Sequence, residues 1–225
     1  MSLLARLFRK QRHIDPFAGF VLPQQWIFVK REENTALYRN ECGDYLSLNY
    51  FGLVPDIAAN LTDLTALRGF YREKTTDVGM AMLEVDVAEV AGIQTARTLL
   101  KGRMQPRGFA FLGSFTFPFA DCSYVVKVQC TEGNPTGMRE SMVMIQLPEL
   151  PQADEATGKL IGWERDPYDV NYRGDFMANL ADDAQYDAQF ADHPLSRARR
   201  YLAELQNELK VPDSFHGFSA FEYGF

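Results

Sequence analysis

The chain has 225 residues, of which 46% are hydrophobic and 13% aromatic, and its formal net charge is −7 with a pI near 5.0. This supply of large apolar side chains argues against global disorder, and the acidic balance argues against nucleic-acid binding through overall charge. The three cysteines, Cys42, Cys122 and Cys130, lack metal-ligand spacing, and free thiols favour a cytoplasmic location.

Residues 1–12 predict a short amphipathic helix. Leu3, Leu7 and Phe8 share one side, and four basic residues supply charge. No uninterrupted apolar region or cleavage site follows, so we expect no secretory signal. The helix can dock on its own domain, on a partner or on a membrane surface, and the sequence leaves these alternatives open.

The next part of the chain, residues 13–150, is predicted to form one core domain. Alternation of apolar and polar residues predicts seven strands, at 26–30, 37–41, 45–53, 81–90, 93–101, 109–117 and 122–131. After the third strand, Leu64, Leu67 and Tyr71 recur at helical intervals, with Asn60 or Thr62 as the expected cap. Short connections favour antiparallel neighbours. We therefore expect an α+β fold with a mostly antiparallel sheet.

The sixth predicted strand carries the strongest pattern of the chain. Its aromatic residues all share one face and are Phe109, Phe111, Phe115 and Phe117. Such a face could line a ligand pocket, but on a half-buried sheet it is normally core. We expect it to pack against the two helices of the core domain.

A second helix is predicted to follow the strands, with Asn134 as its cap and Pro135 in its first turn. Its buried face is expected to consist of Met138, Met142 and Ile145. Prolines then end the element, and we place the domain boundary at residue 150.

Residues 151–225 are predicted to form an acidic linker, a helix and an aromatic tail. The helix has a heptad-like apolar stripe, which must cover either the parent domain or another chain. The residues that we predict to bind a partner are Leu195, Leu202, Leu205, Leu209, Phe218 and Phe221.

No catalytic, cofactor-binding or metal-binding residue is predicted. The acidic stretch 182–193 lacks the ligand spacing of zinc and calcium sites. The chain has no Gly-x-Ser-x-Gly elbow and no phosphate-binding loop. Glu84 and Asp86 are expected on the outward face of a strand, where water solvates them. An enzyme is therefore disfavoured.

The order of three strands, a helix, four strands and a helix resembles the Mog1/PsbP-like α+β fold, including its DcrB-type bacterial domains. Residues that carry the resemblance include Trp26, the strand pair 81–101, the phenylalanine strand and residues 123–128. The resemblance covers about residues 17–147 and lies in element order. Most proteins with this fold are not enzymes, so the resemblance implies a non-enzymatic role. It assigns no binding residue to a position of this sequence.

We therefore predict a non-catalytic bacterial interaction protein of the adaptor, chaperone-like or immunity type, which binds a protein partner. One alternative is a small-molecule-binding or hydrolytic protein whose site is assembled from scattered polar residues. Another is a peripheral membrane protein that uses residues 1–12. No cofactor and no nucleic-acid partner are expected, and the sequence does not determine the oligomeric state.

Overall fold

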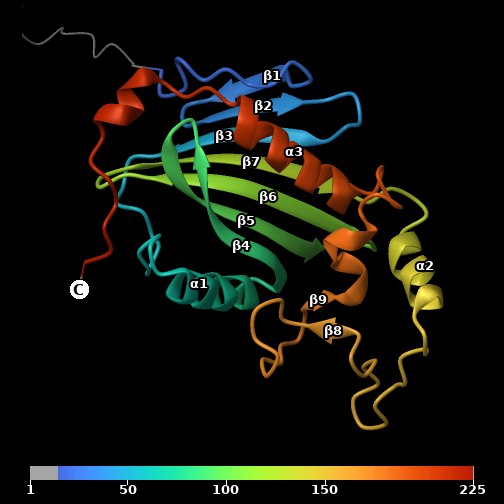
Figure 1. Ribbon diagram of the computed structural model, residues 1–225. Coiled ribbons are helices and arrows are strands. Elements are labelled where there is room, and N and C mark those ends of the chain that lie inside the picture. The colour runs from blue at the N-terminus through green and yellow to red at the C-terminus, as the bar shows by residue number, and fades with distance from the viewer. Residues whose placement is uncertain (1–14, 225) are drawn as a thin grey trace, which may run out of the picture.

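The protein is built around a seven-stranded sheet in which every neighbouring pair is antiparallel. The computed structural model describes residues 15–224, and its strand order is β1-β2-β3-β7-β6-β5-β4 (Figure 1). The strands are β1 (Ile27–Glu32), β2 (Thr35–Arg39), β3 (Tyr45–Phe51), β4 (Met80–Val90), β5 (Ile93–Arg103), β6 (Phe109–Pro118) and β7 (Ser123–Thr131). The predicted α+β class and antiparallel sheet are confirmed.

Within the described residues, three α-helices pack around this sheet (Figure 1). They are α1 (Leu64–Asp77), α2 (Met138–Gln146) and α3 (Pro194–Glu208), and a two-stranded hairpin is formed by β8 (Glu164–Arg165) and β9 (Ala178–Asn179). Helix α1 covers one face of the sheet, α3 covers the other, and α2 lies at the end of the sheet. The extension after residue 150 therefore supplies a layer of the fold. Within residues 15–224, no helix combines the length and the apolar character needed to cross a membrane.

Helix α3 covers the phenylalanine face of β6. Phe111, Phe115 and Phe117 are fully buried in one cluster with the leucines of α3. The approach is close at Gly113, where a Cβ atom would lie 2.8 Å from a methyl carbon of Leu202. The expected core role of this face is correct, but its cover comes from α3 rather than from the two helices before residue 150.

The leucine stripe of α3 is consequently part of the core. Leu195, Leu202 and Leu205 are 0% exposed and Leu209 is 4% exposed, because they pack on the sheet of their own chain. The prediction that these four residues bind a partner is corrected by this burial. Residues before and after residue 150 therefore share one hydrophobic core.

Truncation of this stripe tests its core role. Leu202→Ala is expected to lower the free energy of unfolding by about 2–5 kcal/mol, because it removes buried methyl groups and leaves a cavity over Gly113. Urea unfolding followed by circular dichroism measures the difference. Substitution of the exposed Val170 by Ala is the control and should change stability by less than about 0.5 kcal/mol. Equal effects of the two substitutions would contradict the packing.

A bulge in β4 changes which side its residues face. Met82 pairs with Leu100 and Glu84 with Leu99, so Leu83 is an extra residue in the strand. Leu83 therefore joins the cluster under α3, whereas Val85 joins the cluster under α1. The uninterrupted alternation predicted for 81–90 is wrong at this point.

Helix α1 has the predicted inner face but a different cap. Leu67 is fully buried, and Leu64 and Tyr71 pack beside it. The cap is Asp63, whose carboxylate accepts the Ala66 N–H, rather than Asn60 or Thr62.

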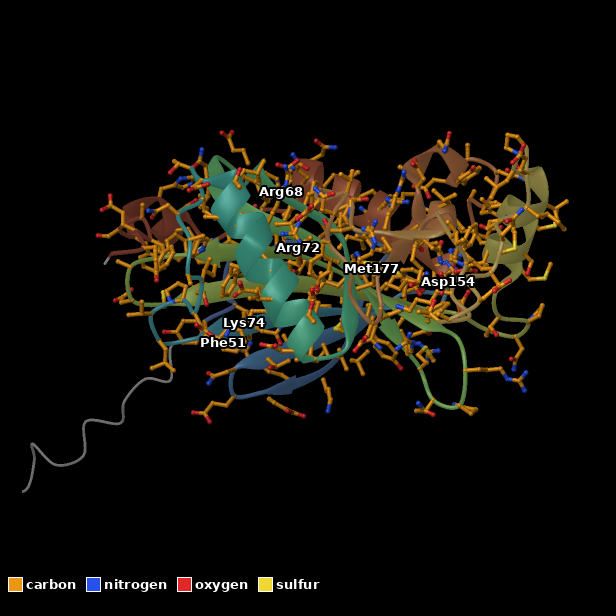
Figure 2. The ribbon with its side chains drawn as sticks, turned by 90° about the horizontal axis from the view of Figure 1, so that it is seen from below. Phe51, Arg68, Arg72, Lys74, Asp154 and Met177 are labelled. Atoms are coloured by element: carbon orange, nitrogen blue, oxygen red, sulfur yellow. The ribbon has the colours of Figure 1, made fainter. Side chains whose placement is uncertain are left out.

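The segment that contains β8 and β9 docks beside α1 and the edge strand β4. Figure 2 shows Arg68 and Arg72 on the side of α1 that faces the segment containing Met177. The guanidinium of Arg72 forms two hydrogen bonds, of 2.8 and 2.9 Å, with the buried carboxylate of Asp166. The Arg68 guanidinium lies 3.8 Å from the ring centre of Tyr168. These contacts fix the chain between α2 and α3, so that both helices meet at one end of the sheet.

Candidate functional site at helix α2

Helix α2 exposes the apolar face that the sequence predicts to be buried. Met138, Met142 and Ile145 are 52%, 42% and 73% exposed. They occur at intervals of four and three residues and therefore lie on one side of the helix. The predicted inner face of α2 is thus its outer face, and the prediction is wrong.

The inner side of α2 is held by a buried arginine. Arg139 is 1% exposed, and its guanidinium donates to the carbonyl oxygens of Ala181 and Asp183 at 2.6 and 2.9 Å. It also donates to Ser196 Oγ at 2.7 Å and to the Asp187 carboxylate at 2.9 Å. A guanidinium has five fixed donors, so this site satisfies most of them. Arg139 and the buried Val143 lie on the inner side of α2, whereas Met138 and Met142 lie on its outer side.

A buried lysine lies next to this arginine. Lys101, on β5, is 0% exposed, and its ammonium lies 3.0 and 3.1 Å from the two oxygens of Asp182. The Glu140 carboxylate of α2 is 3.4 Å away, and the Phe109 ring centre is 4.2 Å away. Burial of an ammonium is costly unless it is paired, and here two carboxylates pair with it.

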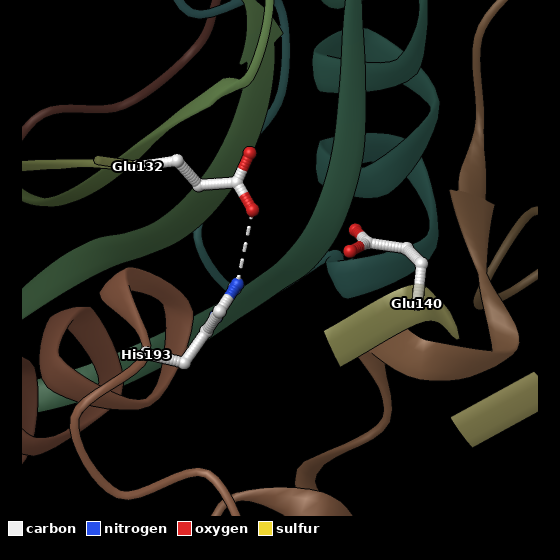
Figure 3. Close-up of side chains that lie close together, drawn as sticks. All are labelled: Glu132, Glu140 and His193. Atoms are coloured by element: carbon white, nitrogen blue, oxygen red, sulfur yellow. Dashed lines mark hydrogen bonds and ion pairs between the residues drawn. The ribbon is translucent and has the colours of Figure 1, made fainter. Parts of the chain in front are cut away.

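Glu132 and His193 form the third polar pair beneath α2. The Glu132 carboxylate and His193 Nε2 are 3.3 Å apart, and Glu140 points toward them (Figure 3). Burial tends to raise the pKa of Glu132, but hydrogen bonds from His193 and two backbone N–H groups outweigh it and hold this pKa below its usual value. The carboxylate is therefore ionised at neutral pH.

Glu132, Glu140 and His193 place three potential metal-ligand atoms within 4.8 Å of one another. The hydrogen bonds of His193 do not fit a bound metal ion. His193 caps α3, because its Nδ1 accepts the Leu195 N–H at 3.2 Å. Its Nε2 must then carry the proton and donate to Glu132. A metal on Nε2 would move that proton to Nδ1, where it would oppose the Leu195 N–H. The Lys101 ammonium would also face the ion across Glu140.

The acidic stretch 182–193 supplies counter-ions instead. Asp182 pairs with Lys101, Asp183 with Arg165, and Asp187 with Arg139 and Arg199. His193, one residue after Asp192, is the N-cap of α3.

The buried cysteines and Glu84 lie in environments that shift their pKa values. Burial, together with the neighbouring Asp121, raises the pKa of Cys122 to about 11, and burial also raises that of Cys130. Thiols of this kind are poor nucleophiles at neutral pH. Glu84 is not solvated as expected: burial alone would raise its pKa, but Arg199 and Arg97 bind it and lower the pKa overall.

The predicted partner-binding residues do not converge on α2. The four leucines lie in the core, whereas Phe218 is 39% exposed and Phe221 is partly buried in the C-terminal segment. The predicted helix of residues 1–12 lies outside the described residues. The sequence contained no local signal for the outer face of α2, because the groups that bury Arg139 lie 42 to 57 residues further along the chain. Hydrophobic periodicity alone gave the opposite orientation.

No family model matches this chain, and no curated protein matches it. Among solved structures, the chain is similar to that of the Saccharomyces cerevisiae Ran-binding protein Mog1p, with 14% identity and a TM-score of 0.38 over 58% of this chain and 78% of the other. It is also similar to a mutant of protein Mog1, with 12% identity and a TM-score of 0.43 over 85% of this chain and 89% of the other. This likeness concerns the fold alone.

Proposed function

We propose that this chain is a non-catalytic interaction protein that binds a protein partner through the outer face of α2. The observation that carries the proposal is the exposure of Met138, Met142 and Ile145 on a helix whose inner side is fixed by buried ion pairs. Methionine is common in surfaces that bind proteins, because its flexible side chain adapts to different partners. Exposed apolar surface of this kind marks a contact site.

The chain after α2 extends this surface. Leu150 and Ile161 are 66% and 62% exposed, and both line a groove of about 490 Å³ together with Leu147. A helix face beside an apolar groove suits a hydrophobic side chain or helix of another protein. The adaptor, chaperone-like or immunity-type role in a bacterial cytoplasm, predicted from the sequence, agrees with such a surface.

Affinity capture with point variants tests the proposal. Tagged full-length protein is expected to retain a stoichiometric partner from its native cells, and Met142→Glu/Ile145→Glu to retain at least tenfold less, because two charges would be buried at the interface. Val170→Glu, at an apolar residue that is 81% exposed and lies between β8 and β9, should retain the partner fully.

Circular dichroism of the variants checks that each is folded, since both altered α2 residues are exposed. Equal retention by the α2 variant and the control would place the interface elsewhere. Absence of any partner on the wild-type chain would count against the interaction function itself.

A further inference from the structure

The C-terminal segment binds the rest of the chain through main-chain contacts of the kind that β-strands form. Residues 218–223 cross the end of the sheet between β6 and the loop before α1. The Ala120 N–H donates to the Ser219 carbonyl at 3.0 Å, and Ala220 forms a β-bridge with Phe119. These contacts are made by the main chain and therefore do not depend on the side chains of the segment.

Asn60 extends this main-chain recognition. Its Oδ1 accepts the Tyr223 N–H at 2.7 Å, and its Nδ2 donates to the Tyr223 carbonyl at 3.4 Å. One side-chain amide thus binds both polar groups of one residue, as a neighbouring β-strand does. Asn60 can do so because Asp63, rather than Asn60, caps α1.

The groove in which the segment lies also accommodates aromatic side chains. The Phe218 ring lies 4.9 Å from the Phe119 ring and 5.7 Å from the Phe215 ring, between ring centres. Phe221 packs on the apolar cluster beneath α1, which includes Leu67. A space of about 610 Å³ lies between the segment and the rest of the chain, with Phe218, Phe221 and Tyr223 forming one wall and Leu61, Ile93 and Gln94 part of the other.

We propose that this groove is a peptide-binding site for an extended segment with aromatic residues at the spacing of Phe218, Phe221 and Tyr223, and that residues 218–223 occupy it in cis. Main-chain hydrogen bonds would supply affinity and the aromatic contacts would supply selectivity, as in other cases of strand addition. A tethered segment has an effective concentration of about millimolar, so a free peptide competes poorly with it. The site is separate from the α2 face and does not depend on the proposed function.

A labelled peptide with the sequence of residues 217–224 tests this site by fluorescence anisotropy on the full-length chain. Tyr223→Pro removes the N–H that binds Asn60 without changing the core, and Phe221→Asp removes the apolar contact. Each variant is expected to bind the peptide at least tenfold more tightly than the wild type, because the competing segment is released.

Adding Asn60→Ala to either variant should weaken peptide binding at least fivefold. Asn207→Ala is the matched control, because its amide bonds only the Ala203 carbonyl of its own helix, and it should have no effect. Thermal unfolding identifies any variant that is not folded, and the two release variants provide independent tests. Equal binding by wild type and a folded release variant, no binding by either, or insensitivity to Asn60→Ala would overturn the proposal.

Discussion

Replacement of Lys101 by Met is expected to lower the free energy of unfolding by about 3–5 kcal/mol. The ammonium of Lys101 is 0% exposed and pairs with Asp182, which is itself 5% exposed. Methionine can occupy the space of the lysine stem, but it leaves the Asp182 carboxylate buried without its cation. Breaking a buried ion pair in this way is more destabilising than losing the pair altogether. Denaturant unfolding followed by circular dichroism measures the change.

The exposed pair of Lys74 and Asp56 is a matched control. Their side chains are 52% and 88% exposed, so Lys74→Met should cost less than about 1 kcal/mol. The double variant Lys101→Met/Asp182→Asn should recover at least half of the lost stability, because it removes the unpaired charge and keeps an oxygen for the Asn179 N–H. A loss below 1 kcal/mol in Lys101→Met would show that the ammonium is not buried as described.

Replacement of Arg139 by Met is expected to cost about 2–4 kcal/mol and to weaken partner binding as well. The substitution leaves the carbonyl oxygens of Ala181 and Asp183 without their donor, and each unsatisfied buried group costs about 1–3 kcal/mol. Because Arg139 holds the inner side of α2, its loss should also allow the outer face to move. Unfolding and affinity capture measure the two effects on the same protein.

Arg107→Met serves as the control for this substitution, since Arg107 is exposed and should contribute within about 0.5 kcal/mol. Loss of stability with full partner retention would show that the orientation of α2 does not matter for binding. Full stability of Arg139→Met would contradict the buried network itself.

The sequence by itself determined the strands and the first helix. Alternation along 93–101 and 109–117 predicted β5 and β6 within a few residues, and the spacing of Leu64, Leu67 and Tyr71 predicted the inner face of α1. These predictions succeed because side chains on one face of a strand or helix share one environment, so local periodicity reports burial directly. The class of fold followed from the order of these elements.

The orientation of α2, the cover over the phenylalanine face and the role of Asn60 were decided only by the tertiary structure. Arg139 pairs with Asp187, which is 48 residues away in the sequence, and Lys101 pairs with Asp182, which is 81 residues away. A buried charge is tolerated only where distant residues supply its partners, and periodicity in one segment carries no information about those partners. For this reason the sequence identified the helix that carries the candidate site but placed its two faces in the wrong directions.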